Sequence, residues 1–255
     1  MGDEVVLSEN ADSVVEILPR KNEFIRPPVA NIDQMVVVTS VISPAIDYLM
    51  IDSLIINIEA RGLEAVVCIN KSDINGEDEC KKVAEIYNKA GYKTVITSAS
   101  TGQGREELGQ ILRDKTTAFS GSSGVGKSSL LNLIDSEFML ETGSVSRKLE
   151  RGKHTTRHVE LFPLRDGGYV LDTPGFAKTD LPPITTAELS GLFREMAQRS
   201  DECRFKGCAH IFEPSCAVRE AIENGEISQS RYESYKYFYE KLKDVKEWNK
   251  SKKIY

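Results

Sequence analysis

The sequence lacks any long hydrophobic run, and no stretch approaches the roughly 20 apolar residues that a membrane-spanning helix needs. The amino-terminal residues MGDEVVLSEN are acidic, without the basic and then apolar order of a secretory signal peptide. There are only five cysteines. Cys68 and Cys80 are isolated, whereas the other three cluster with His210, which in a reducing compartment argues for metal binding over disulfides. We therefore expect a cytoplasmic protein without a membrane segment.

Positive charge is also in short supply, because 39 aspartates and glutamates outnumber 33 lysines and arginines. The formal net charge of −6 disfavours bulk affinity for nucleic acid, so any contact with RNA has to come from local basic patches. Proline and glycine are not in excess, and neither internal repeats nor low-complexity tracts occur. The 255 residues are enough for one large domain or two to three small ones.

Compact apolar runs that begin at Met35 predict an α/β domain. The runs MVVVTS, AVVCIN, KTVITSAS and TTAFSG have helical spacers between most of them, a pattern typical of parallel strands buried on both faces. Residues 157–171 form two alternating runs around Asp166, Gly167 and Gly168, which predicts a hairpin and an antiparallel part of the sheet. After Pro183 the pattern becomes helical, with tyrosines at three-four spacing near the end.

Residues 121–129, GSSGVGKSS, have the form of a phosphate-binding loop between a predicted strand and a predicted helix. The glycines let backbone N–H groups surround phosphate oxygens, Lys127 adds a positive charge at the β and γ positions, and Ser128 can bind Mg²⁺. We expect contacts from Gly121, Ser122, Ser123, Gly124, Val125, Gly126, Lys127, Ser128 and Ser129. The pattern alone also fits a chance match or an ATP-binding protein.

Three further loops are predicted to bind the same nucleotide as the phosphate loop. Asp172 and Gly175 form a DxxG motif, in which the aspartate holds Mg²⁺ through water and the glycine N–H meets a γ-phosphate. Residues 70–73, NKSD, follow another strand, and a carboxylate there selects guanine because it accepts both the N1 hydrogen and the exocyclic amine. In the TSAS segment that closes the next strand, the backbone N–H of Ala99, beside Ser98, can bind the guanine oxygen.

The expected guanine contacts come from Asn70, Lys71, Ser72, Asp73, Ser98 and Ala99. Asn70 is expected to contact the other base edge and to support the loops, and the stem of Lys71 can cover the ring. A plain polar turn between strand and helix is the alternative for NKSD taken alone. The base-reading loops precede the phosphate loop here, whereas Ras-like GTPases have the opposite order, so the domain is circularly permuted.

The ordered set of motifs, which includes RGKHTTRH at residues 151–158 and Cys-x4-Cys-x-His-x5-Cys at residues 203–216, closely resembles the bacterial small-ribosomal-subunit-dependent GTPases of the RsgA (YjeQ/YloQ) type. The resemblance covers nearly the whole chain from about Lys21. It implies a GTPase that binds the small (30S) ribosomal subunit late in its assembly and is stimulated by it. It also implies a circularly permuted Ras-like P-loop GTPase domain and a C-terminal helical zinc-binding domain.

The resemblance assigns roles to residues of the switch loops. Thr156 corresponds to the ligand of Mg²⁺ and γ-phosphate, and His154 matches a histidine linked to catalysis, alongside Lys127. From the residues alone, a generic loop histidine is an equal interpretation of His154. Phe176 stands where Ras-like enzymes have the glutamine that positions water, so intrinsic hydrolysis should be slow unless His154 or the ribosome supplies that group.

The cysteine cluster resembles the zinc site of the same family. Three thiolates and one imidazole, from Cys203, Cys208, Cys216 and His210, form a closed tetrahedral set, so the metal should be one structural Zn²⁺ per chain. Buried cysteines without a metal are the alternative. Nearby Arg204, Lys206 and Arg219 can offset the negative centre, touch RNA phosphate, or simply be solvated.

The expected domains are a partial OB-fold remnant with a linker at 1–34, the GTPase domain at 35–182 and the zinc-binding helical domain at 183–255. Two β-rich runs cannot close the family's five-stranded OB barrel, so either the sequence starts inside that domain or part of the RNA contact is lost. The expected partners are GTP/GDP with Mg²⁺, and the small ribosomal subunit with its rRNA; the chain is expected to be a monomer. A nucleotide-gated rRNA-binding module with incidental hydrolysis is the alternative function, and an ATP-using enzyme is disfavoured by Asp73.

Overall fold

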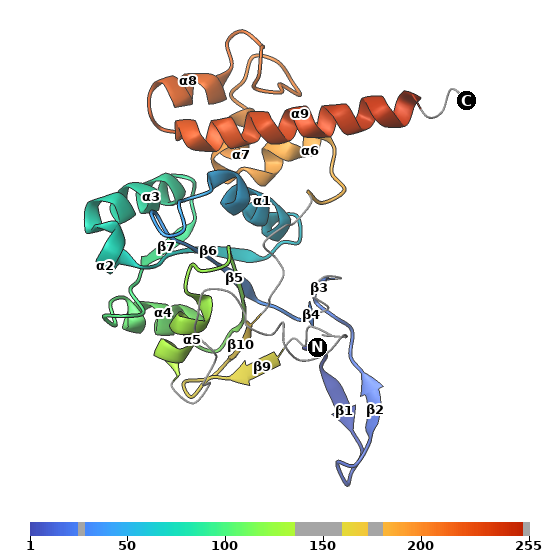
Figure 1. The fold of residues 1–255 in the computed structure, drawn as a ribbon. Helices are drawn as coiled ribbons and strands as arrows, with labels where there is room; N and C mark the ends of the chain where they lie inside the picture. Colours follow the sequence, from blue (N-terminus) through green and yellow to red (C-terminus); the bar gives the residue numbers. More distant parts are fainter. Residues whose placement is uncertain (25–28, 136–159, 173–180, 252–255) are drawn as a thin grey trace.

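A six-stranded sheet forms the centre of this computed structural model, which describes residues 1–24, 29–135, 160–172 and 181–251 (Figure 1). The strand order is β7-β6-β5-β8-β10-β9. The strands are β5 (Gln34–Thr39), β6 (Glu64–Ile69), β7 (Lys93–Ile96), β8 (Thr116–Ser120), β9 (Glu160–Pro163) and β10 (Tyr169–Asp172). All pairs are parallel except β9 with β10, which confirms the predicted parallel sheet with an antiparallel hairpin.

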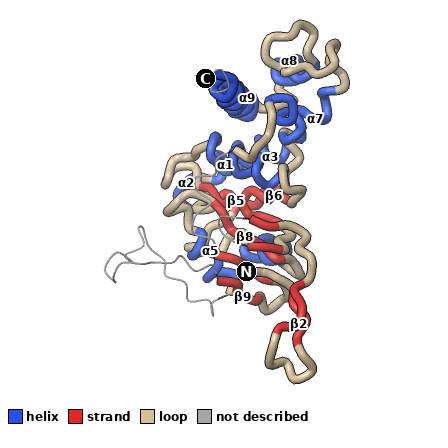
Figure 2. Tube along the Cα trace, turned by 90° about the vertical axis from the view of Figure 1, so that its right-hand side faces the viewer, coloured by secondary structure: helices blue, strands red, loops and turns tan. Residues whose placement is uncertain are grey.

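Helices cover both faces of the sheet (Figure 2). Residues of α1 (Tyr48–Glu59) and α3 (Glu77–Lys89) share a buried core with Val37, whereas α4 (Arg105–Leu112) and α5 (Lys127–Ile134) share one with Val36. Successive side chains of a strand point to opposite faces, so a strand between two helical layers must be apolar at every position. This explains the continuous apolar runs in the sequence.

The four loops predicted to bind nucleotide all emerge at the carboxyl edge of this sheet. Ile69 of β6 pairs with Ile96 of β7, and Val37 of β5 pairs with Ser120 of β8. Asp172 of β10 pairs with Phe119 of β8. Ligands of open α/β sheets bind outside the carboxyl ends of the strands, so the register places the predicted loops at the expected edge.

The C-terminal part is helical and has its own apolar core. It contains α6 (Thr186–Leu189), the 3₁₀ helix η2 (Ser190–Leu192), α7 (Arg194–Ser200), α8 (Ala217–Glu223) and α9 (Gln229–Ser251). A capping box formed by Thr185 and Glu188 begins α6. The core of the C-terminal part includes Phe193 and Tyr235 and also Ile56 of α1, so the two parts of the chain are packed together.

A buried ion cluster joins this helical part to the sheet domain, where α9 contacts α1 (Figure 1). Arg231 of α9 is only 1% exposed, and its guanidinium lies 2.5 Å from a carboxylate oxygen of Asp52 in α1 and 2.7 Å from one of Glu195 in α7. The ring of Phe193 lies under the guanidinium, with its centroid 4.5 Å away. A charge removed from water is tolerated only with such partners, so this cluster specifies how α9 sits on α1.

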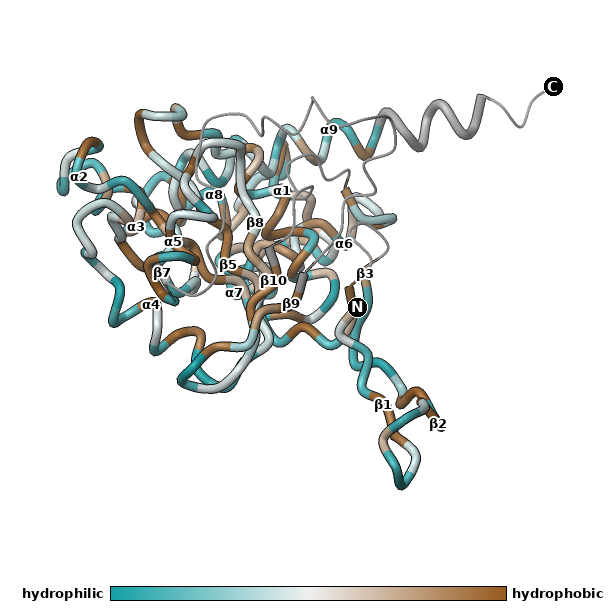
Figure 3. Tube along the Cα trace, turned by 60° about the horizontal axis from the view of Figure 1, so that its bottom comes forward, coloured by the Kyte–Doolittle hydropathy of each residue, from teal (hydrophilic) through white to brown (hydrophobic). Residues whose placement is uncertain are grey.

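The N-terminal segment differs in part from its prediction. Strands β1 (Val5–Leu7) and β2 (Val14–Ile17) form a two-stranded hairpin that projects from the body with exposed hydrophobic residues (Figure 3). The predicted linker, however, contains two short antiparallel strands, β3 (Glu23–Phe24) and β4 (Val29–Ala30), and therefore has regular structure of its own. Ile32 and both residues of β4 are buried in the core beneath α1, because this stretch carries apolar side chains between its prolines and charges. No helix among the described residues is long and apolar enough to cross a membrane.

Candidate nucleotide site and metal centre

The loop at residues 121–126 connects β8 to the start of α5, and its three glycines all have positive φ. Gly121 has a φ of 143°, and a Cβ there would lie 2.1 Å from the carbonyl oxygen of Val38, so only glycine fits. Lys127 Nζ donates to the carbonyl oxygens of Gly121 and Ser122 at 2.8 and 2.9 Å, which holds its ammonium group over the loop. Amide groups at a helix start and a nearby cation together favour a phosphate group.

Asn70 connects this phosphate loop to the predicted base-reading loops. Its side-chain amide donates to the carbonyl oxygen of Val125 at 2.8 Å. Its Oδ1 accepts from the Thr97 hydroxyl at 3.1 Å and from the Ala99 N–H at 3.3 Å. A Cβ at Gly126 would lie 2.4 Å from Asn70 Nδ2, so the glycine is needed for this close contact. The Asn70 side chain therefore joins the phosphate loop to the TSAS segment.

Asp73 lies at the surface with its carboxylate held by two serine hydroxyls. Ser98 Oγ donates to Oδ1 at 2.7 Å, and Ser100 Oγ donates to Oδ2 at 2.8 Å. These bonds, the Ser98 bond first, lower the pKa of Asp73, so the carboxylate is ionised at neutral pH. Each oxygen has a further lone pair that can accept a hydrogen bond. The result is a fixed, anionic double acceptor.

Three residues that support these loops are not among the predicted ligands. Ser100 ends the predicted TSAS segment, and Gln103 accepts from the Ser72 hydroxyl at 2.6 Å. Asn75 is buried, with its amide donating to Asn70 O at 2.7 Å and its Oδ1 accepting from Ile42 N at 3.1 Å. These contacts join loops that are distant in sequence, and polar residues after a strand are too common to be singled out.

The remaining predicted nucleotide ligands are placed as follows. Lys71 has a left-handed backbone with φ of 65°, and its Nζ donates to Ser43 O at 2.8 Å. Ser128 and Ser129 lie in the first turn of α5, and the backbone of Asp172 ends β10 beside the strand that leads into the phosphate loop. Ser123 and Gly124 are exposed at the loop tip, and Val125 is buried. His154, Thr156, Gly175 and Phe176 lie outside the described residues, so their roles stay predictions.

Three cysteines and one histidine meet in the C-terminal part. The ligand atoms of Cys203, Cys208, His210 and Cys216 all lie within 4.8 Å of one another. Cys203 Sγ is 3.9 Å from Cys216 Sγ, and His210 Nδ1 is 3.6 and 3.3 Å from these two sulfurs. Donor atoms around a tetrahedral zinc ion with zinc–sulfur bonds of about 2.3 Å lie roughly 3.5–3.8 Å apart. The donor set therefore fits Zn²⁺ in both chemistry and spacing.

Surrounding residues orient the histidine of this cluster. His210 is buried, and its Nε2 lies 3.2 Å from Ser200 Oγ, whose hydroxyl donates to Met196 O at 2.8 Å. Because that hydroxyl proton is already used, Ser200 accepts the Nε2 hydrogen, and Nδ1 is left with a free lone pair on the side of the sulfurs. Tyr232 of α9 donates to His210 O at 2.7 Å and fixes the backbone. Sequence spacing identified the four ligands but not these supports.

Comparison with known proteins agrees with this geometry. Residues 17–182 match the family model described as RsgA GTPase. The chain belongs to the RsgA GTPase family. The small ribosomal subunit biogenesis GTPase RsgA of Caldanaerobacter subterraneus subsp. tengcongensis is 48% identical over 245 residues, which are 96% of this chain and 82% of that protein. The protein of the same name from Bacillus subtilis is 42% identical over 253 residues, covering 96% and 85%.

Solved RsgA-family structures share the fold. The crystal structure of YjeQ from Thermotoga maritima has a TM-score of 0.79 and 40% identity, covering 94% of this chain and 83% of that one. The structure of YloQ, described as a circularly permuted GTPase, has a TM-score of 0.76 and 36% identity, covering 96% and 80%. The predicted circular permutation and GTPase activity are thereby confirmed.

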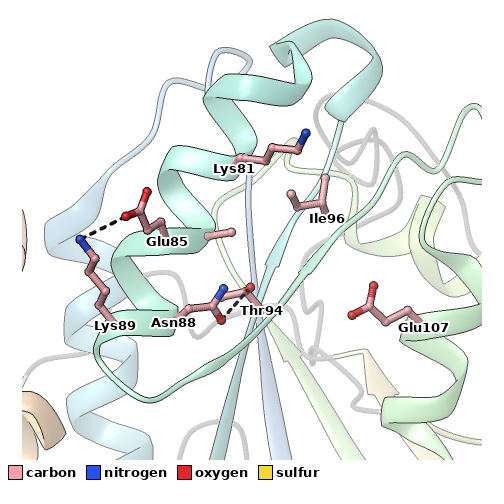
Figure 4. Close-up of a pocket in the computed structure, with 8 residues that line it drawn as sticks. Lys81, Glu85, Asn88, Lys89, Thr94, Ile96 and Glu107 are labelled. Carbon is pink, nitrogen blue, oxygen red and sulfur yellow. Dashed lines mark hydrogen bonds and ion pairs between the residues drawn. The ribbon is translucent and has the colours of Figure 1, made fainter.

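A shallow hollow between α3 and α4, beside the edge strand β7, is separate from these RsgA-family motifs (Figure 4). On the α3 side of the hollow, Lys89 pairs with Glu85 at 3.1 Å, and Thr94 of β7 donates to Asn88 at 3.0 Å. Its lining contains none of the residues of the phosphate loop, NKSD or TSAS. We assign no nucleotide contact to it.

Proposed function

We propose that this GTPase binds a single guanine nucleotide across the four loops at the carboxyl edge of the sheet. The observation that carries the proposal is the bond from Asn70 to the Val125 carbonyl, which joins the NKSD loop to the phosphate loop. In this arrangement residues 121–129 hold the phosphates, and Asp73 accepts the two guanine donors. The Ala99 N–H, now donating to Asn70, is shared with the guanine oxygen, and Lys71 covers the ring.

Hydrolysis in this proposal depends on positioning and electrostatics, without a covalent intermediate. Lys127 stabilises negative charge at the β- and γ-phosphates. Ser128, Thr156 and Asp172 would hold Mg²⁺, which neutralises charge on the phosphate oxygens when bound. Gly175 would meet the γ-phosphate through its backbone N–H. His154 would orient the attacking water, since the apolar Phe176 cannot.

The metal centre is proposed to hold one structural Zn²⁺ through Cys203, Cys208, His210 and Cys216. Four protein donors fill a tetrahedral shell and leave no position for a reacting water. The ion would tie the loop at residues 203–216 to α9, through the bond from Tyr232 to His210 O. Its role is to stabilise the C-terminal domain rather than to take part in hydrolysis.

The proposed partner is the small ribosomal subunit with its rRNA. The relatives with 42–48% identity over most of the chain carry the name small ribosomal subunit biogenesis GTPase, which supports this assignment. RNA contacts would come mainly from the zinc domain, α9 and the switch loops, because the chain as a whole is acidic. We also propose that the protein acts in the cytoplasm, as a monomer, late in subunit maturation.

GTP turnover with and without purified small subunits tests this function. Stimulation by the subunits is the expected result, and it should be reduced in His154→Ala. A second candidate, a nucleotide-gated rRNA-binding module, is favoured by the apolar Phe176 and would show no stimulation at all. Competition by ATP as strong as by GTP would contradict the guanine assignment of Asp73.

A further inference from the structure

One aromatic side chain of the zinc domain is exposed on a well-anchored loop. Phe212 is 83% exposed, the highest value among the exposed large hydrophobic residues of the described chain. It lies two residues after the zinc ligand His210 and follows the half-buried Ile211, which packs on the domain core. A lone exposed apolar residue is common, so its setting decides whether it has a function.

The backbone around Phe212 is fixed by hydrogen bonds on both sides. The Glu213 carboxylate accepts the N–H groups of Ala209 at 2.8 Å and of Ile211 and Phe212 at 3.1 Å each. Tyr235 of α9 donates to Ala209 O at 2.8 Å. A turn held by five such bonds, counting the one from Tyr232 to His210 O, presents the phenyl ring in a defined position. A contact made by a preorganised group loses little conformational entropy on binding.

Cations stacked on aromatic rings lie in the same domain. The Arg204 guanidinium lies 5.5 Å from the centroid of the Phe205 ring, which is itself 43% exposed. Lys236 Nζ lies 5.0 Å from the ring of Tyr232, the residue bonded to His210 O. Arg219 belongs to α8, whose first residue, Ala217, directly follows the ligand Cys216. Arg204 lies on the same loop as Phe212, where its N–H donates to Ser215 O at 3.4 Å, and Lys236 lies on the helix whose Tyr232 is bonded to that loop.

Exposed aromatic rings with neighbouring cations match the chemistry of single-stranded RNA. An unpaired base stacks on a phenyl ring, and the adjoining phosphates bind lysine and arginine. A hydrophobic pocket on a protein would use the phenyl ring but has no need of the cations. We propose that Phe212 is a stacking platform for an unpaired RNA base, with Arg204, Arg219 and Lys236 binding the flanking phosphates. This inference rests on the proposed function for its natural RNA, the rRNA of the small subunit.

The full-length variants Phe212→Ala and Phe212→Trp test the proposal, with Tyr169→Ala as the matched control. Tyr169 is an aromatic residue 46% exposed at the start of β10, at the edge of the sheet opposite the phosphate loop. Binding is measured to purified small subunits and to a single-stranded RNA oligonucleotide that contains 2-aminopurine, whose fluorescence falls on stacking. Basal GTP turnover and zinc content are measured in parallel.

Phe212→Ala should weaken both complexes roughly 5- to 150-fold, the loss of one base–aromatic stack. It should also abolish the fluorescence quenching, whereas Phe212→Trp should retain affinity and quenching. The control should change affinity less than twofold, and basal turnover and zinc content should stay normal in all variants. Arg204→Gln should make the slope of log affinity against log salt concentration shallower, by about the amount that one phosphate contact contributes.

Unchanged affinity and quenching in Phe212→Ala would overturn the proposal. The proposal would also be overturned if Phe212→Leu bound as tightly as Phe212→Trp. That result would indicate that the side chain enters a hydrophobic pocket of a protein. If the wild-type protein bound the RNA oligonucleotide through Phe212 but not the subunit, the proposed function would fail and the stacking site would stand. Binding of neither partner by the wild type would overturn both.

Discussion

The substitution Asp73→Asn tests the guanine site most directly, because the structure shows that it should leave the loop intact. Both carboxylate oxygens of Asp73 accept serine hydroxyls, from Ser98 at 2.7 Å and from Ser100 at 2.8 Å. An asparagine has the same shape. Its Oδ1 can keep the Ser98 bond while its NH₂ group donates to Ser100, whose hydroxyl can rotate. The side chain should therefore keep its position, and only the groups that it offers to the base should change.

The expected loss of GDP affinity follows from the donors of guanine. Guanine presents two N–H groups to the carboxylate, and in the variant one of them faces an NH₂ donor instead of an acceptor. Losing one charge-assisted hydrogen bond and placing two donors together costs about 2–4 kcal/mol. This corresponds to an increase in the Kd for GDP of roughly 30- to 1,000-fold. Xanthine carries a carbonyl in place of the amine, so the amide should bind XDP more tightly than the wild type does.

Titration of GDP and XDP by calorimetry measures both affinities, and thermal unfolding checks the fold. Asp78→Asn, which removes the same charge from the exposed first turn of α3, is the control and should leave the GDP/XDP preference unchanged. An Asp73→Asn variant with normal thermal stability and the wild-type preference for GDP would refute the assignment. Asp73 would then lie outside the base site.

Three further predictions concern the other parts of the structure. Arg231→Met should destabilise the protein by about 3–5 kcal/mol in denaturant unfolding, because it leaves two buried carboxylates without a counter-charge; a loss below 1 kcal/mol would contradict this. Ser200→Ala should weaken zinc binding roughly 10- to 100-fold in competition with a chelator, since His210 loses its Nε2 partner, and unchanged affinity would argue against that support. Gly126→Ala should lower nucleotide affinity at least about tenfold, because its Cβ would meet Asn70 Nδ2 at 2.4 Å and its φ is 95°; normal GDP binding would show that the loop adapts.

The sheet, and the strand ends that carry the proposed nucleotide loops, could be predicted because their signals are local. Strands buried on both faces give continuous apolar runs, and the phosphate loop lies directly between a strand and a helix. The cluster of three cysteines and one histidine could be predicted for the same reason, since Cys203 and Cys216 are only 13 residues apart. In each case one short stretch of sequence carries the whole pattern.

The contacts that join distant segments could not be predicted in this way. Arg231 and Asp52 are 179 residues apart, and nothing in either helix distinguishes a buried ion pair from solvated charges. Prolines and charges dominate the segment before β5, and this composition predicts a linker. Burial of Val29 and Ile32 beneath α1 depends on a tertiary contact that the composition of the segment does not reveal.

Helix α1 has contacts with both functional regions. Near its start, Met50 Sδ accepts from the Ser122 hydroxyl of the phosphate loop at 2.9 Å. Two residues later, Asp52 pairs with Arg231, which directly precedes Tyr232, the residue bonded to the backbone of the proposed zinc ligand His210. A 12-residue helix is rigid over its length of about 18 Å. Any displacement of α1 at the phosphate loop must therefore either carry α9 with it or separate a buried ion pair, and the cost of separation, about 3–5 kcal/mol, favours movement as one unit.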